Sequence, residues 1–304
     1  MYAVRKLIML IPVMLGVSFL VFLMMRVLPG DPAKSRAGLR ATPEMVEQIR
    51  HELGLDKPLA VQYFIFLRDA LELDFGRSIR TNQLVIDEFL VRYPNTILLT
   101  VTATLIFLIL GIPLGVTAAV HHGSIWDGLS ILISLVGISM PSFWLGLLLI
   151  WNFSVRLKLL PSYGLTSPKH LILPAITLAA YGIAYTARYT RASMLEELGQ
   201  DYVMTARSKG LSERIVIYGH ALRNALLPIV TQAALGFGYM LGGSVVIEEV
   251  FTVNGVGKLI VDAILYRDFP VVQAGVLLIA LNFVLVNLIA DLAYGLIDPR
   301  IRLS

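Results

Sequence analysis

Residues Thr96–Val120 read TILLTVTATLIFLILGIPLGVTAAV and include no aspartate, glutamate, lysine or arginine. As a helix that rises about 1.5 Å per residue, this stretch can cross the roughly 30 Å of hydrocarbon in a bilayer. A charge at the centre of such a helix costs about 2.5–3.5 kcal/mol on insertion, so a charge-free stretch of this length indicates a transmembrane span. Its apolar residues are continuous rather than alternating, which favours a helix over a barrel strand.

Five other stretches lack ionised side chains in the same way: Leu7–Met25, Gly128–Phe153, Leu171–Ala187, Asn224–Ile247 and Val271–Ala290. The whole chain is 57% hydrophobic and 15% charged, whereas an ordinary soluble domain is about 25% charged. The first stretch is longer than the roughly 7–15 residues of a signal-peptide core, so we interpret it as a retained signal anchor. We therefore predict an all-α membrane protein with six transmembrane helices.

The predicted spans divide the chain into three parts. These are an N-terminal tail and first span (1–25), an external loop with short helices (26–95), and a membrane core (96–304) with spans 96–120, 128–153, 171–187, 224–247 and 271–290, loops 188–223 and 248–270, and a tail 291–304. With both termini inside, the inner segments hold ten basic residues and the short outer loops five, which favours this orientation. The small net charge of +4 therefore relates to topology and lipid rather than to nucleic-acid binding.

The external loop carries helix signals of its own. Thr42 can cap a helix that has Pro43 at its first position, and Gly54 can end it. A second apolar-rich stretch runs from Pro58 to Leu73. We expect a small cap of short helices here, although a solvated loop with local helices remains an alternative.

Motifs of catalysis are absent from the sequence. The fragment Gly255–Leu259 lacks the first glycine and the final Ser/Thr of a Walker A motif, and neither His-Glu-x-x-His nor Gly-x-Ser-x-Gly occurs. There is no cysteine, and the adjacent His121 and His122 would diverge on a helix, so no metal site is predicted. The predicted spans contain no ionisable residue, which argues against an ion-coupled transporter and an embedded enzyme.

The predicted inner loop, 188–223, contains a short helix with stop signals at both ends. Asp201 can cap a helix over Tyr202–Lys209, and Gly210 can end it. Ser212 can then cap the helix that leads to Pro228. Such a stiff element between two spans could transmit force from a soluble partner, and an ordinary amphipathic loop helix is the alternative.

Glycines and uncharged polar residues mark a possible path through the core. Gly238 and Gly242 form a small-x-x-x-small pair, which permits close helix packing, whereas Gly242, Gly243 and Ser244 could instead lie where a pore narrows. Polar residues within the spans could line a path or only bond between helices. The pore candidates are Gln232, Gly242, Gly243, Ser244, Glu248 and Asn282, and Asn152 and Asn287 are further polar residues of this kind.

Several motifs together carry a family resemblance that spans nearly the whole chain. They are Leu28–Ala33 (LPGDPA), Gly54–Leu59 (GLDKPL) with Gln62-Tyr63, Asp201–Leu211 (DYVMTARSKGL), His220–Pro228 (HALRNALLP), Gly242–Glu248 (GGSVVIE) and Asp298–Arg302 (DPRIR). In these motifs the chain resembles the dipeptide/oligopeptide/nickel permease family of ABC importers. Of the general importer pattern Glu-Ala-Ala-x-x-x-Gly, it keeps Ala206 and Gly210.

This resemblance implies a type I importer permease fold in a bacterial inner membrane, with a coupling helix that docks on a separate ATPase. The coupling residues would be Asp201, Tyr202, Thr205, Ala206, Arg207, Lys209, Gly210 and Leu211. The implied partners are a second permease, two cytoplasmic ATPases that hold the ATP and magnesium, and an external binding protein. Di- or oligopeptides are the preferred cargo, with glutathione or a nickel chelate as alternatives, and a self-sufficient transporter or channel as the rival function.

Overall fold

The computed structural model describes residues 2–27, 32–38, 41–52 and 54–297, and these are almost entirely helical. The helices are α1 (Tyr2–Val27), α2 (Pro32–Ala37), α3 (Pro43–Glu52), α4 (Leu59–Leu71), α5 (Val85–Val120), α6 (Ile125–Ser139), α7 (Ser142–Leu149), the π-helix η1 (Ile150–Arg156), α8 (Pro168–Leu198), α9 (Asp201–Ser208), the π-helix η2 (Ile215–Ala221), α10 (Leu222–Val250), α11 (Val256–Leu265) and α12 (Phe269–Ile297). The described residues form one isolated bridge, Arg77 to Leu84, and no longer strand. The predicted all-α fold is confirmed. The motif residues Leu28–Asp31 and Asp298–Arg302 lie outside the described residues.

Within the described parts of the chain, four helices are long and apolar enough to cross a membrane. They are Val85–Val120, Pro168–Leu198, Pro228–Val250 and Phe269–Ile289, and the apolar part of α1, Met9–Met24, is shorter. The third predicted span is not one straight helix, because α6 and the α7–η1 helix meet at an angle of 103°. Pro141 disfavours helical backbone at the residue before it, and Met140 is extended (φ −84°, ψ 121°). The structure therefore supports four or five such spans and does not confirm six.

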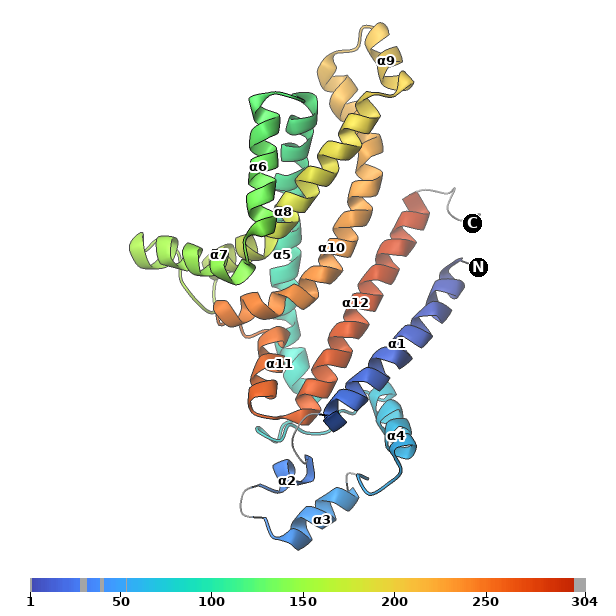
Figure 1. The fold of residues 1–304 in the computed structure, drawn as a ribbon, viewed down its shortest axis with the longest axis vertical. Helices are drawn as coiled ribbons and strands as arrows, with labels where there is room; N and C mark the ends of the chain where they lie inside the picture. Colours follow the sequence, from blue (N-terminus) through green and yellow to red (C-terminus); the bar gives the residue numbers. More distant parts are fainter. Residues whose placement is uncertain (1, 28–31, 39–40, 53, 298–304) are drawn as a thin grey trace. The chain divides into compact units, whose positions relative to one another are not determined.

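The chain divides into two compact units. The first unit comprises residues 1–94 and 254–284, and the second comprises 95–253 and 285–304. Two long helices, α5 and α12, begin in the first unit and continue into the second. Figure 1 shows the element order by colour.

The first unit has two packed parts. In one, α1 contacts α4 through the rings of Phe22 and Tyr63, and the Tyr63 hydroxyl donates to the carbonyl of Leu15 at 3.2 Å. In the other, the start of α5, α11 and the start of α12 enclose a hydrophobic core that includes Phe89, Ile260 and Phe269. The short helix α3 is capped as predicted, since the Met45 N–H donates to Thr42 Oγ1 at 3.4 Å and Gly54 follows at φ +62°.

Buried Asp268 fastens the connection before α12 to the turn before α5. Its carboxylate accepts hydrogen bonds from the Ser78 hydroxyl at 2.5 Å and from the backbone N–H groups of Ile79 and Arg80 at 3.1 and 3.3 Å. Charge-assisted bonds of this kind are stronger than neutral ones. They satisfy a carboxylate whose burial would otherwise be costly.

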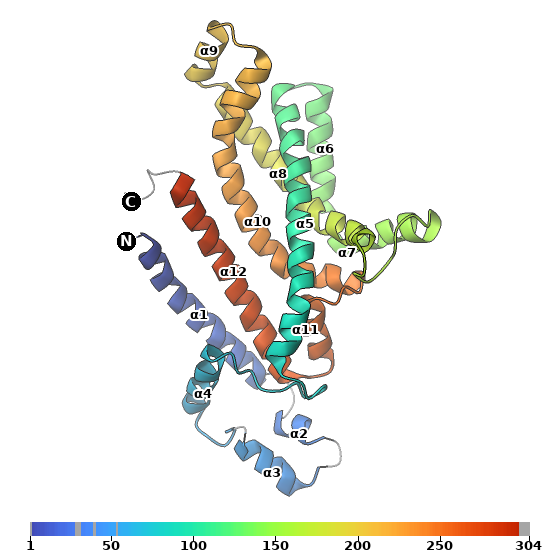
Figure 2. The ribbon, with the colours of Figure 1, turned by 180° about the vertical axis from the view of Figure 1, so that it is seen from behind.

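The second unit is built around α8, which packs against α10, α6 and α7 (Figure 2). Its contact with α5 depends on two glycines one helical turn apart. A Cβ atom at Gly111 would lie 2.9 Å from Thr186 Cβ, and one at Gly115 would lie 2.5 Å from Thr190 Cβ. The close approach that the sequence suggested for Gly238 and Gly242 is not seen at Gly242, because a Cβ there would meet no atom within 4 Å.

Candidate functional site

The short helix predicted in the inner loop exists and spans Asp201–Ser208 as α9. Asp201 is its first helical residue and not its cap, which corrects the sequence-based prediction. The N-cap position belongs to Gln200, which is extended and accepts the Val203 N–H at 3.0 Å through its backbone carbonyl. Asp201 still places a negative charge in the first turn, where it complements the helix dipole.

Gly210 ends α9 as predicted. Its φ of +78° lies in the left-handed region that residues with side chains rarely adopt. The Gly210 N–H donates to Arg207 O at 2.9 Å and the Leu211 N–H donates to Ala206 O at 3.4 Å. This pair of bonds is the Schellman arrangement, which satisfies the last carbonyls of a helix and fixes the direction in which the chain leaves it.

One face of α9 is anchored in the second unit. Val203 and Ala206 are buried in a cluster that includes Met194 of α8, Val216 of η2 and Ile229 of α10. Ala206, one of the implied coupling residues, therefore seats the helix on its own chain. These two buried residues, three positions apart on one face, hold α9 against the ends of α8 and α10 (Figure 1).

The other face of α9 is open. Met204, which was not among the implied coupling residues, is 64% exposed. Apart from Ala206, the implied coupling residues are exposed too: Asp201, Tyr202, Thr205, Arg207, Lys209, Gly210 and Leu211. Arg207 forms an ion pair with Glu213 at 2.9 Å, which bridges the turn at Gly210. An exposed apolar side chain within a charged rim suits contact with another protein.

The start of α9 is also tied back to α8. The Tyr202 hydroxyl donates a hydrogen bond to the Glu197 carboxylate. Partial burial of the ring and this bond raise the pKa of Tyr202, so the phenol stays protonated as the donor. Only Gly199 and Gln200 separate α8 from α9, and the connection is therefore short and fixed.

A polar cluster that no sequence pattern indicated joins α6 and α8 in the second unit. Arg191 of α8 makes two bonds to Asp127 at the start of α6, Nε to Oδ1 at 2.6 Å and Nη2 to Oδ2 at 2.9 Å. The Gly123 N–H donates to the same carboxylate at 3.0 Å, and His122 Nδ1 lies 2.9 Å from it. The charges stand at the edges of charge-free stretches, but nothing in their spacing of 64 residues indicates a pair.

Three of the pore candidates are occupied in bonds inside the chain. Glu248 is fully buried and accepts from Thr96 Oγ1 at 2.7 Å, and Ser244, also fully buried, donates to Leu241 O at 3.0 Å. In the first unit, Asn282 donates to Leu278 O at 2.8 Å and accepts from the Tyr93 hydroxyl. These side chains therefore make bonds between or within helices, which was the alternative to lining a path, and their part in a path stays a prediction.

The other pore candidates lie on α10 in more open surroundings. Gln232 and Gly243 are half-buried, and Gly242 is exposed. A Cβ atom at Gly242 or Gly243 would meet nothing within 4 Å. The structure therefore leaves open space beside Gly242 and Gly243 on α10.

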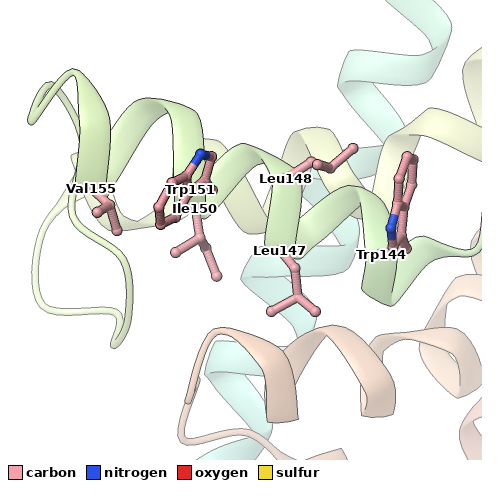
Figure 3. A pocket seen from close by; sticks show the side chains of 6 residues that line it. All are labelled: Trp144, Leu147, Leu148, Ile150, Trp151 and Val155. Atoms are coloured by element: carbon pink, nitrogen blue, oxygen red, sulfur yellow. The ribbon is translucent and has the colours of Figure 1, made fainter.

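A hollow of about 430 Å³ lies beside α7 and η1 (Figure 3). Its lining is Trp144, Leu147, Leu148, Ile150, Trp151 and Val155, which are apolar apart from the indole N–H groups. Such a surface suits lipid tails or another apolar surface better than a hydrated solute. Within the described ranges, no three histidine or acidic side chains lie together as metal ligands would.

Comparison with known proteins establishes the class to which the chain belongs. Residues 111–303 match the family "Binding-protein-dependent transport system inner membrane component", and residues 1–100 match its N-terminal counterpart. The chain belongs to this family, so it is a multi-pass inner-membrane permease subunit of an ABC importer.

Named relatives and one solved structure agree with this class. The chain is 46% identical over 301 residues to the "Glutathione transport system permease protein GsiC" of Escherichia coli K12 and to that of Shigella dysenteriae Sd197, covering 99% of this chain and 98% of each relative. A chain of the inward-facing MetNI methionine ABC transporter matches with a TM-score of 0.54 and 18% identity, over 67% of this chain and 93% of that one. The fold is that of a type I importer permease, and the predicted family is confirmed.

Proposed function

We propose that this permease carries small peptides, including glutathione-type tripeptides, across the inner membrane by alternating access, and that separate cytoplasmic ATPases drive it through α9. The observation that carries the proposal is the two-sided construction of α9. One side is buried in the chain's own core through Val203 and Ala206, and the other exposes Met204. A helix of this kind can receive a push on one side and pass it to the spans on the other.

The geometry around α9 supports a mechanical role. The Schellman turn at Gly210, the Arg207–Glu213 ion pair and the two-residue link to α8 leave few soft backbone positions at its ends. Movement of a docked ATPase would therefore displace the ends of α8 and α10 rather than bend the loop. Stiff packed elements move as bodies and do not deform continuously.

The cargo class rests on the relatives. Their names specify glutathione, a tripeptide, and this supports the glutathione alternative as much as the peptides preferred from sequence. Both have an amide backbone and free carboxylates, so one path could serve both. We place the binding protein outside, two ATPases inside, and a second similar permease beside this chain, with both termini of this chain in the cytoplasm.

The proposal is tested by reconstituting the chain with its partner subunits and measuring uptake of radiolabelled glutathione and dialanine into liposomes with ATP inside. Met204→Glu should leave the complex assembled in the membrane but reduce uptake and cargo-stimulated ATP hydrolysis together. Leu265→Glu is a matched control, because Leu265 is an equally apolar and exposed residue on α11 of the first unit. Uptake by the chain alone without ATP, or normal coupling in the Met204→Glu complex, would contradict the proposed role.

A further inference from the structure

Four tyrosines gather on one surface of the second unit. Tyr181, Tyr185 and Tyr189 follow one another at intervals of four residues along α8, and their rings stack with centroids 6.1 and 6.4 Å apart. Tyr239 of α10 extends the row, with its ring centroid 6.3 Å from that of Tyr181. We call this surface the tyrosine face.

Tyr181 and Tyr239 lie near the middle of their helices, whereas Tyr185 and Tyr189 lie nearer the end of α8 that precedes α9. Tyr239 is the central residue of the span Pro228–Val250, about 16 Å from either end at 1.5 Å per residue. Tyr181 lies about 20 Å from the start of α8 and about 25 Å from its end. The belts that tyrosines form at membrane–water boundaries therefore do not explain the positions of Tyr181 and Tyr239.

The hydroxyl groups on this face make no hydrogen bond among the described residues, and Tyr189, unlike the other three tyrosines, is half-buried. Tyr239 is 70% exposed, and Tyr181 and Tyr185 are also exposed. Among the described residues, these four tyrosines interact through the ring contacts given above, and their hydroxyls have no hydrogen-bond partner. A phenol hydroxyl directed into lipid tails would lose its hydrogen bonds to water without replacement, so this face fits a hydrated surface.

A cation continues the same surface. Arg188 lies seven residues after Tyr181, two helical turns along the same face of α8, and its side chain is exposed without an ion-pair partner among the described residues. The opposite face of α8 is buried, with Gly182 against Phe107 and Thr186 against Gly111. A guanidinium binds carboxylates in a bidentate manner, and phenols donate to and accept from amides and carboxylates.

We propose that the tyrosine face and Arg188 form one wall of the solute path, and that this wall receives the carboxylates and amides of a small peptide during transport. The inference rests on the proposed function, since it names the surface that such a cargo would meet. Stacked rings provide a sequence-tolerant surface, because their faces and hydroxyls contact backbone groups that every peptide shares. Gln232 and Gly242, at positions i−7 and i+3 relative to Tyr239, lie on the same side of α10 and leave room beside it.

The absence of cysteine from this chain makes the path directly testable. Tyr185→Cys and Tyr239→Cys are made singly, with Ile133→Cys on the exposed face of α6 as a lipid-facing control. The assembled transporter is treated with a membrane-impermeant maleimide, and label on this chain is followed over time. Because the thiolate reacts and apolar surroundings suppress it, we expect labelling at positions 185 and 239 to be at least about tenfold faster than at 133.

Cargo protection distinguishes a solute path from any other wet surface. Dialanine and S-methylglutathione, which lacks a free thiol, should slow labelling at 185 and 239 and leave the rate at 133 unchanged. Tyr239→Phe keeps the ring, and its expected effect is a rise in KM for uptake of about three- to tenfold, as for loss of one hydrogen bond. Arg188→Gln should weaken transport of dialanine more than transport of its C-terminal amide.

Several outcomes of these experiments would overturn the inference. Thiols at 185 and 239 that react as slowly as the control, that are unprotected by a transported peptide, or that join two permease subunits through a bifunctional reagent would overturn the inference. An unchanged KM in Tyr239→Phe together with equal transport of acid and amide by Arg188→Gln would overturn it as well. Failure of the complex to take up any peptide would instead count against the proposed function, so the two failures remain distinguishable.

Discussion

Replacement of Gly115 by alanine is expected to separate α5 from α8. An added Cβ would lie 2.5 Å from both the Ala187 carbonyl oxygen and Thr190 Cβ, where ordinary contacts begin at 3.4 Å. The nearest atoms belong to backbone and to a Cβ, which cannot rotate away, so the helices must move apart locally by about 0.9 Å.

The expected loss of stability follows from this overlap. Overpacking of a well-packed interior costs about 1–3 kcal/mol. The alanine recovers up to about 1 kcal/mol through its helix propensity, which offsets only part of the loss. Gly128→Ala is the matched control, because Gly128 is also helical but a Cβ there meets no atom within 4 Å. That variant should be neutral or slightly stabilised.

Thermal unfolding in detergent, followed by tryptophan fluorescence, measures the difference. The chain's three tryptophans, Trp126, Trp144 and Trp151, all lie in the second unit, so the signal reports on the part that the substitution perturbs. We expect Gly115→Ala to unfold several degrees below wild type and Gly128→Ala to unfold at or above it. Equal unfolding temperatures for the two variants would refute the proposed close packing of α5 on α8.

Three other predictions concern the turn after α9, the polar cluster and the first unit. Gly210→Val should destabilise the turn by about 1–3 kcal/mol and uncouple ATP hydrolysis from uptake. Gly210→Asn should retain most coupling, because asparagine tolerates positive φ. Similar uptake by the two variants would argue against a role for the turn. Arg191→Leu should lower the unfolding temperature and Asp127→Leu added to it should restore part of the loss, and additive losses in this double-mutant cycle would exclude the pair. Asp268→Asn should lower the free energy of unfolding by about 1–3 kcal/mol, because an amide cannot accept from all three donors now bound. Ser78→Ala should lower it less. A larger loss for Ser78→Ala than for Asp268→Asn in denaturation experiments would count against this account.

Much of the fold could be predicted from sequence, because long charge-free stretches allow few solutions in a bilayer. The ends of short helices were also predictable where one residue decides them, as for Gly54 and Gly210, both at positive φ. The bend between α6 and α7 was missed, although Pro141 stands in the middle of the third stretch. The absence of charge indicates that a stretch is apolar, but it gives no information about a bend at a proline within that stretch.

The site was less predictable because its contacts depend on the three-dimensional arrangement. The short helix Asp201–Ser208 was located, but the burial of Ala206 follows from packing on η2 and α10, which no local pattern encodes. Asp127 and Arg191 meet across 64 residues, and polar residues such as Glu248 proved to be bonded internally. The tyrosine spacing on α8 was visible in the sequence, but its meaning required the exposure of the rings and the position of Tyr239.

The long, uninterrupted part of α8 can move as a rigid helix. From Pro174 to its end at Leu198 the helix contains no proline, and Thr186 and Thr190 hold it against α5 at Gly111 and Gly115. From the middle of this contact, α8 extends about 15 Å toward α9 and about 10 Å back to Tyr181. If α9 receives the force as proposed, a sideways displacement at that end would reach Tyr181 reversed in direction and reduced to roughly two-thirds.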